Sequence, residues 1–176
     1  MAENDAISGY LPLGRHKVSH RGYWKARRNG YFCAPTIGSM KKLVFIIEDD
    51  LVQQKALQIH FEEILARYTA RTFSNPEDML QHLKEKPFAV VLDHFFSDDE
   101  GKTGLDYLRI MRSKYPSIPV IYYTTLEDEA VRNEVMSLGA EEYIIKNSAS
   151  LVRLRAALDN LHDRESKKGF FGKLFS

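Results

Sequence analysis

One feature constrains the fold of this chain more than any other: an apolar run that ends abruptly in a carboxylate, Phe88-Ala89-Val90-Val91-Leu92-Asp93. An uninterrupted apolar run of this length is typical of a strand that is covered on both faces, as strands in parallel sheets are. The aspartate at its end must meet water or a cation. The run therefore predicts a buried strand that delivers Asp93 to the carboxyl edge of a sheet, and Asp93 is the candidate reactive residue.

The composition favours one globular domain with appendages. The chain has 176 residues, of which 44% are hydrophobic and 28% charged, which argues against both a membrane protein and a disordered one. No stretch approaches the length needed to cross a bilayer, and the first residues lack the order of a secretory signal. A single cysteine, Cys33, excludes an internal disulfide framework and a cysteine-based zinc site. We therefore expect a cytoplasmic protein.

Charge is divided unevenly along the chain. Residues 1–39 carry six Lys or Arg and two acidic residues, a net charge of +4, so residues 40–176 carry a net charge of −3. This mildly acidic remainder offers no electrostatic case for nucleic-acid binding. Residues 1–39 show no helical or strand period, and Gly38-Ser39 before Met40 is typical of a cloning junction, so we interpret them as a flexible or vector-derived leader. The open alternative is that their interleaved basic and aromatic residues bind RNA or lipid.

Beyond the leader, apolar runs alternate with segments of helical spacing, which is typical of repeated βα units and a parallel sheet. The predicted strands of five such units are 43–47, 68–73, 88–92, 120–124 and 142–146, and the predicted helices include 51–67, 127–138 and 148–164. The second strand mixes polar and apolar residues, which suits a half-exposed edge. The first helix is expected to bury a stripe made of Val52, Ala56, Ile59 and Ile64. The second helix is expected to start at a serine cap, Ser74, followed by Pro76.

Polar residues stand where each strand predicted to be central ends. They are Glu48-Asp49-Asp50, Asp93, Thr124-Thr125 and Lys146. The carboxyl ends of parallel strands form one edge, so neighbouring strand ends bring these side chains within ~5 to 10 Å of one another. Clustered carboxylates repel one another and favour a cation, and oxygen-only ligands favour Mg²⁺. With a lysine and a hydroxyl nearby, Asp93 is equipped to be the nucleophile of phosphoryl transfer and to form an acyl phosphate. The alternative is that these are only the polar residues at which buried strands stop.

At these residues the chain resembles the receiver domain of two-component response regulators, over about residues 42–163. The motifs that carry the resemblance are Leu43-Val44-Phe45-Ile46-Ile47-Glu48-Asp49-Asp50, Val91-Leu92-Asp93, Pro119-Val120-Ile121-Tyr122-Tyr123-Thr124 and Gly139-Ala140-Glu141-Glu142-Tyr143-Ile144-Ile145-Lys146. The resemblance implies a three-layer α/β/α, flavodoxin-like fold of five βα units, with a five-stranded parallel sheet in the order 2-1-3-4-5. We accordingly divide the chain into the leader, a receiver domain over 40–164 and a basic aromatic tail over 165–176.

The same resemblance implies roles for the site residues. Asp93 matches the phosphoacceptor, and Lys146 would bind a phosphoryl oxygen. Mg²⁺ is the implied cofactor. Asp49 would bind it directly, Glu48 through water, and the backbone carbonyl of Phe95 would complete the protein ligands.

The resemblance also implies a switch and its partners. A phosphoryl group would draw Thr124 inward and let Tyr143 rotate inward, so that the surface of the fourth helix, fifth strand and fifth helix changes its preferred partner. Receivers take phosphate from a phosphohistidine of a sensor histidine kinase or a histidine phosphotransfer protein. We expect a signalling switch and not an enzyme in the usual sense, since receivers catalyse only their own phosphorylation and later hydrolysis.

The sequence departs from the family pattern in three places. Asn147 stands where the family usually has a proline after the site lysine, and the loop 95–104 is longer than usual and lacks the typical proline. Positions that tune autohydrolysis in the family hold Phe95 and Leu126, which are apolar and poorly suited to orient water, so we predict a slowly decaying phosphorylated state. His94 follows Asp93 on a strand and should therefore point to the opposite face, as a core or helix-facing histidine and not a catalytic one.

Two rival functions stay open at this point. One is a degenerate receiver that acts as a phosphorylation-independent interaction module. The other is a flavodoxin-like cofactor binder or phosphohydrolase, against which the lack of a glycine-rich phosphate loop after the first strand argues. The tail, 165–176, is too short for an output domain, so we expect a stand-alone receiver that acts on an unknown downstream protein or relays phosphate. Membrane docking by this tail is an alternative to a frayed end.

Overall fold

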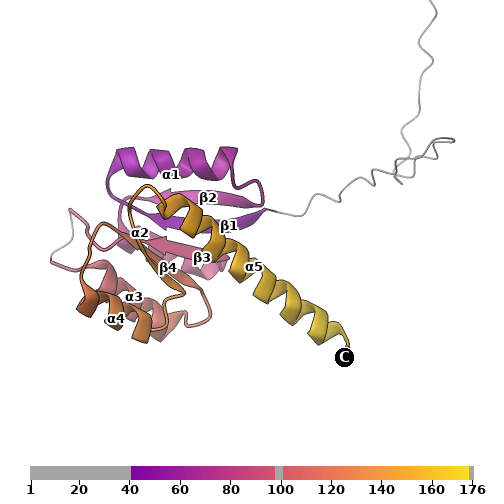
Figure 1. Cartoon of the computed structure of the whole chain (residues 1–176). Helices are drawn as coiled ribbons and strands as arrows, with labels where there is room; N and C mark the ends of the chain where they lie inside the picture. Colours follow the sequence, from indigo (N-terminus) through magenta and orange to yellow (C-terminus); the bar gives the residue numbers. More distant parts are fainter. Residues whose placement is uncertain (1–40, 98–100, 175–176) are drawn as a thin grey trace, which may run out of the picture. The chain divides into compact units, whose positions relative to one another are not determined.

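The computed structural model describes residues 41–97 and 101–174, and side chains as far as residue 167. The predicted leader, 1–39, lies outside the described residues. Strands and helices alternate along the described chain, as the sequence predicts (Figure 1). They are β1 (Lys42–Ile47), α1 (Leu51–Glu63), β2 (Tyr68–Phe73), α2 (Pro76–His82), a 3₁₀ turn (Leu83–Glu85), β3 (Ala89–Leu92), α3 (Gly104–Lys114), β4 (Val120–Thr124), α4 (Glu129–Ser137), β5 (Glu142–Ile145) and α5 (Ser150–Leu174).

The five strands form one parallel sheet in the order β2-β1-β3-β4-β5. The predicted fold class and strand order are therefore confirmed. β2 lies at an edge and is half-exposed, whereas β3 and β4 are buried over their whole length. The apolar run before Asp93 thus crosses the middle of the sheet, where both of its faces are covered.

Helices cover both faces of the sheet and complete three layers (Figure 1). On one face, α1 and α5 pack on the sheet through apolar side chains of which the largest are Leu57, Phe61, Leu154, Leu158 and Leu161. On the other face, α2, α3 and α4 contribute Met79, Tyr107, Leu108, Met111 and Val135. No helix among the described residues has both the length and the apolar character needed to span a membrane.

The predicted buried stripe of α1 is wrong. Its four members are all exposed: Val52, Ala56, Ile59 and Ile64. The helix instead buries Leu57 and Phe61, which are four residues apart and face the sheet. Because α1 carries apolar residues on more than one side, the spacing alone did not select the face that packs. The helix also ends at Glu63, before the predicted end at residue 67.

The start of α2 also differs from the prediction. Its cap is Asn75, whose side chain accepts a hydrogen bond from the Glu77 amide at 2.7 Å, while Pro76 occupies the first turn as predicted. Ser74 lies one residue too early and instead accepts a hydrogen bond from the Gln54 side chain at 3.2 Å. Both residue types cap helices well, so sequence preference did not choose between them.

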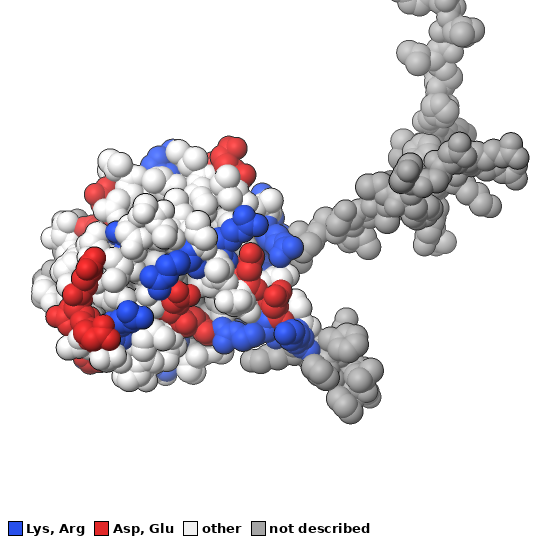
Figure 2. Space-filling model, in the orientation of Figure 1, with Lys and Arg blue, Asp and Glu red and all other residues white. Residues whose placement is uncertain are grey.

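The last helix continues beyond its predicted end at residue 164 and through most of the predicted tail. No proline interrupts residues 165–174, and Glu and Lys there are good helix formers. Ion pairs also tie the helix to the sheet at this point, since Arg164 contacts Glu141 and Lys42 contacts Glu165. Figure 2 shows basic and acidic side chains side by side on this face.

Candidate functional site

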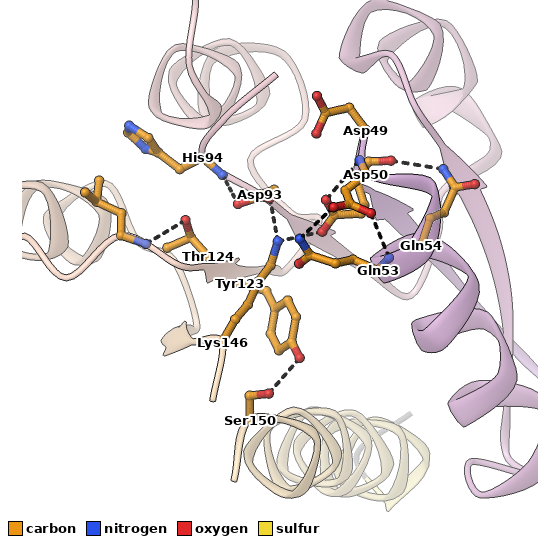
Figure 3. Close-up of polar contacts among 12 residues, drawn as sticks. Asp49, Asp50, Gln53, Gln54, Asp93, His94, Tyr123, Thr124, Lys146 and Ser150 are labelled. Carbon is orange, nitrogen blue, oxygen red and sulfur yellow. Dashed lines mark hydrogen bonds and ion pairs between the residues drawn. The ribbon is translucent and has the colours of Figure 1, made fainter. Parts of the chain in front are cut away.

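The carboxyl edge of the sheet gathers the predicted site residues. Glu48 and Asp49 follow β1, Asp93 follows β3, and Lys146 follows β5. The hydrogen-bond ladder of the sheet continues through these residues, since the Asp93 amide donates to Ile47 at 3.2 Å and the Lys146 amide donates to Thr124 O at 2.7 Å. Strand pairing therefore places side chains from three separate strand ends in one site (Figure 3).

The ammonium group of Lys146 bridges two carboxylates. Its Nζ lies 2.5 Å from Asp93 Oδ2 and 2.6 Å from Glu48 Oε2, and all three side chains are at least nine-tenths buried (Figure 3). Burial opposes the charge of Lys146, but the two carboxylates outweigh it and raise the pKa of the lysine above its ordinary value. Burial also raises the pKa of Glu48 from 4.5 to about 6, although Lys146 acts in the opposite direction.

Three acids lie close enough to share a cation. One carboxylate oxygen each from Glu48, Asp49 and Asp93 lie within 4.8 Å of one another. An all-oxygen set of this kind fits Mg²⁺, which takes one or two carboxylates and keeps several waters. Phe95 is 51% exposed, and the role of its backbone carbonyl as a further Mg²⁺ ligand stays a prediction.

Ser97 holds the carboxylate of Asp49. Its backbone amide and its hydroxyl both donate to Asp49 Oδ2, at 2.8 and 2.5 Å. Burial opposes ionisation of Asp49, but these hydrogen bonds outweigh it and lower the pKa of the carboxyl. The contact was not predicted. The sequence did contain a signal for it. The loop lacks the typical proline, and every residue other than proline carries an amide hydrogen that can be donated.

The phosphoacceptor candidate is also held by its own loop. The His94 amide donates to Asp93 Oδ1 at 2.6 Å, and the Gly104 amide donates to His94 O at 2.8 Å. Gly104 approaches so closely that a Cβ there would lie 1.9 Å from the Asp93 carbonyl oxygen. Only glycine allows the start of α3 to pack this tightly beneath Asp93.

Both predicted switch residues, Thr124 and Tyr143, form a hydrogen bond with the backbone of Leu126. Thr124 is fully buried, and its hydroxyl oxygen accepts a hydrogen bond from the Leu126 amide at 3.2 Å (Figure 3). The Tyr143 hydroxyl donates to the Leu126 carbonyl at 2.8 Å. Tyr143 is only 2% exposed. Its ring therefore points inward.

His94 points away from the acids, as expected, although it lies two residues beyond the end of β3 (Figure 3). It is buried, and its Nδ1 lies 2.7 Å from the Tyr122 hydroxyl. After Lys146 the chain turns without a cis bond, since no peptide bond in the described part is cis. Asn147 instead accepts a hydrogen bond from the Ala149 amide at 2.9 Å, which starts the turn into α5.

Comparison with protein families finds a family that matches this chain. The sequence model of the response regulator receiver domain matches residues 44–159, which include every candidate site residue. Among curated proteins, the chain is 30% identical over 115 residues to the methanogenesis regulatory protein FilR1 of Methanothrix harundinacea, which covers 63% of this chain and 25% of that protein. It is also 30% identical over 103 residues to the transcriptional regulatory protein FlgR of Helicobacter pylori, covering 58% of this chain and 25% of that protein. The chain thus spans about a quarter of the length of these curated relatives.

Solved structures agree with this match. The chain resembles response regulator DrrB of Thermotoga maritima with 25% identity and a TM-score of 0.60, over 72% of this chain and 54% of that chain. It resembles the receiver domain of a LuxO repressor protein from Vibrio parahaemolyticus with 18% identity and a TM-score of 0.65, over 75% and 98% of the two chains. The second likeness supports the fold alone.

Proposed function

Because the chain belongs to the response regulator receiver domain family, whose members are signalling switches, we propose that it accepts a phosphoryl group on Asp93 and changes its protein contacts in response. One observation supports this role more than any other. The Lys146 ammonium group lies 2.5 Å from Asp93 Oδ2, beside two further acids that can share a cation with Asp93. A nucleophilic carboxylate, a fixed positive charge and a cation site are what phosphoryl transfer requires.

The acid cluster fits Mg²⁺ by its donor chemistry. Glu48, Asp49 and Asp93 would hold the ion, with the Phe95 carbonyl as a further ligand. When bound, Mg²⁺ would neutralise negative charge on the acids and on the phosphoryl oxygens. The raised pKa of Glu48 is consistent with this role, because it reflects a buried negative charge that Lys146 alone does not fully stabilise.

The proposed reaction is a transfer from a phosphohistidine to Asp93. One carboxylate oxygen of Asp93 attacks the phosphorus, so that a P–O bond forms as the P–N bond to the imidazole breaks. The imidazole nitrogen leaves with the bonding electron pair, which leaves an acyl phosphate on Asp93 and a free histidine on the donor. Lys146 stays beside the phosphoryl oxygens, and the Thr124 hydroxyl can donate its proton to one of them while still accepting from Leu126.

The proposed partners follow from this chemistry. The donor is a sensor histidine kinase or a histidine phosphotransfer protein, and the acceptor of the signal is a downstream protein that contacts the face of α4, β5 and α5. The only reactions that the chain would catalyse are its own phosphorylation and slow dephosphorylation. The cytoplasmic location expected from the sequence is part of the same proposal.

A beryllofluoride titration tests the proposal. The full chain would be titrated with beryllofluoride in the presence and absence of Mg²⁺, with binding followed by calorimetry and backbone amide NMR. We expect Mg²⁺-dependent binding and shifts around Lys146 and Thr124 in the wild type, both lost in Asp93→Asn. Asp78→Asn, an exposed aspartate on α2, is the matched control and should respond as the wild type does.

Two outcomes would contradict the proposal. Absence of any response in the wild type would favour a phosphorylation-independent interaction module. A response that survives in Asp93→Asn would mean that the group binds elsewhere.

A further inference from the structure

Two consecutive tyrosines on β4 point to opposite faces of the sheet. Tyr122 lies in the core shared with α2, α3 and α4, whereas Tyr123 lies in the core shared with α1 and α5. Tyr123 is held by a 2.7 Å hydrogen bond between its hydroxyl and Ser150 Oγ (Figure 3). Tyr122 therefore sits on the same face as the switch aromatic Tyr143, which the neighbouring strand β5 carries at the same register position.

The ring of Tyr122 is the platform on which Tyr143 rests. The two rings stack with centroids 5.4 Å apart and planes 13° from parallel. Tyr122 is fully buried and Tyr143 is 2% exposed, so the stacked pair excludes water. Offset stacking of two buried rings adds to the stabilisation that burial already provides.

The hydroxyl end of Tyr122 is clamped beside Asp93. Its oxygen lies 2.7 Å from His94 Nδ1, and a Cβ at Gly104 would lie 2.8 Å from it. His94 also donates its backbone amide to Asp93 Oδ1, and its carbonyl accepts from the Gly104 amide. One side chain thus touches both the loop that holds Asp93 and the ring of Tyr143.

We propose that Tyr122 is a positioning residue which, clamped by His94 and Gly104, holds the Tyr143 ring buried whether or not Asp93 carries a phosphoryl group. The proposal rests on the proposed function, since Tyr143 matters here as part of the face that responds to phosphorylation. It changes the expected switch in one respect. With the ring held in this way, the response to phosphorylation would pass through Thr124 and the Leu126 backbone and not through inward rotation of Tyr143.

A spectroscopic experiment on Tyr143 tests this role. The full chain would carry 3-fluorotyrosine at position 143, and ¹⁹F NMR with a soluble gadolinium chelate would report the accessibility of that ring. In the wild type we expect a protected signal both without ligand and with Mg²⁺ and beryllofluoride. In Tyr122→Met, which fills the space but offers no flat platform, we expect the accessible population without ligand to rise by about two- to tenfold. Mg²⁺ and beryllofluoride should then restore protection.

Tyr122→Phe separates the hydroxyl contact of Tyr122 from the stacking of its ring, and Tyr123→Phe serves as a control. Tyr122→Phe keeps the ring and loses the hydroxyl bonded to His94, so we expect a smaller rise than in Tyr122→Met. This conservative variant carries the test if Tyr122→Met does not fold. Tyr123→Phe removes the corresponding hydroxyl on the opposite face and should leave the Tyr143 signal unchanged.

The outcomes distinguish this proposal from the proposed function. An accessible Tyr143 in the unliganded wild type would overturn the proposal, and so would unchanged protection in both Tyr122 variants. Binding of beryllofluoride is measured separately by calorimetry. If the wild type fails to bind it, the proposed function fails, whereas the unliganded signal still decides what Tyr122 does.

Discussion

Ser97 donates both its backbone amide and its hydroxyl to one oxygen of Asp49, at 2.8 and 2.5 Å. The two residues are 48 positions apart in sequence, and the contact fixes the orientation of a carboxylate that we propose as a Mg²⁺ ligand. Hydrogen bonds to a ligating carboxylate commonly tune the affinity of the metal site.

Loss of this hydroxyl should weaken Mg²⁺ binding. We expect Ser97→Ala to lower the Mg²⁺ affinity by about tenfold, because Asp49 keeps only the amide hydrogen bond and samples other orientations. Calorimetric titration with Mg²⁺ measures the effect. Ser137→Ala, on the exposed surface of α4, is the matched control. Unchanged or higher affinity in Ser97→Ala would show that Ser97 does not support the ligand.

Removal of the site lysine should destabilise the metal-free protein. Lys146→Met leaves the buried carboxylates of Glu48 and Asp93 without their shared cation. Removing one partner of a buried ion pair lowers the free energy of unfolding by about 3 kcal/mol. Protonation of Glu48 below pH 6 should reduce that loss, because it removes one of the unpaired charges. Urea unfolding in EDTA measures it, with the exposed Lys55→Met as control. Equal stability of Lys146→Met and the wild type would argue against a buried charge cluster.

The stability of the metal-free protein should fall as pH rises from 4.5 to about 6. Burial raises the pKa of Glu48 from 4.5 to about 6, so the folded protein holds a proton that the unfolded chain has released. The stability from this proton is therefore fully present below pH 4.5 and is lost as pH rises through 6, an effect on the order of 2 kcal/mol. Mg²⁺ affinity should move in the opposite direction, since the proton and the cation compete for the same carboxylate.

A comparison with Glu48→Gln isolates this effect from other titrating groups. Urea unfolding in EDTA between pH 4 and pH 7 gives the stability of both proteins. The difference between them should change across the interval from about 4.5 to 6. If both proteins show the same pH dependence, Glu48 is not the group responsible.

The phosphorylated protein should lose its phosphate slowly. The two positions that tune hydrolysis in the family hold Phe95 and Leu126, and both backbone polar groups of Leu126 are already bonded, to Thr124 and Tyr143. Neither residue offers a side-chain group that orients an attacking water. The double variant Phe95→Asn, Leu126→Gln should shorten the lifetime by about tenfold or more. Phosphate release after acetyl phosphate treatment measures the lifetime, and Ile64→Gln, at an exposed position, is the control. A wild-type half-life of seconds with Mg²⁺ would contradict the prediction.

Gly104→Ala should damage the site as well as the fold. Its Cβ would meet the Asp93 carbonyl oxygen at 1.9 Å, so the start of α3 must move away from Asp93, at a cost of about 2 kcal/mol or more. We expect weaker Mg²⁺ binding as well as lower stability. Gly139→Ala is the comparison, because its φ of +85° costs about 1 kcal/mol of strain far from the acids. Mg²⁺ affinity that falls equally in both variants would rule out a local effect at Gly104.

Local signals explain most of what could be predicted from the sequence. An apolar run that ends in a carboxylate identifies a buried strand and its polar end, whatever the rest of the chain does. The same reasoning holds for Lys146 after β5 and for Pro76 in the first turn of α2. By contrast, the predicted stripe of α1 failed at Val52 and Ile59, because both sides of that helix carry apolar residues and the spacing fits either.

By itself, the sequence determined the succession of strands and helices along the chain and the polar residues at the strand ends. Hydrophobic periodicity and the residues that end a strand or helix are local properties. Only the tertiary structure decided which side of α1 is buried, that Ser97 holds Asp49, and that Tyr122 joins His94 to Tyr143. These contacts join residues far apart in sequence. They depend on strand register and on how helices pack on the sheet. The spacing of apolar residues within a single segment determines neither.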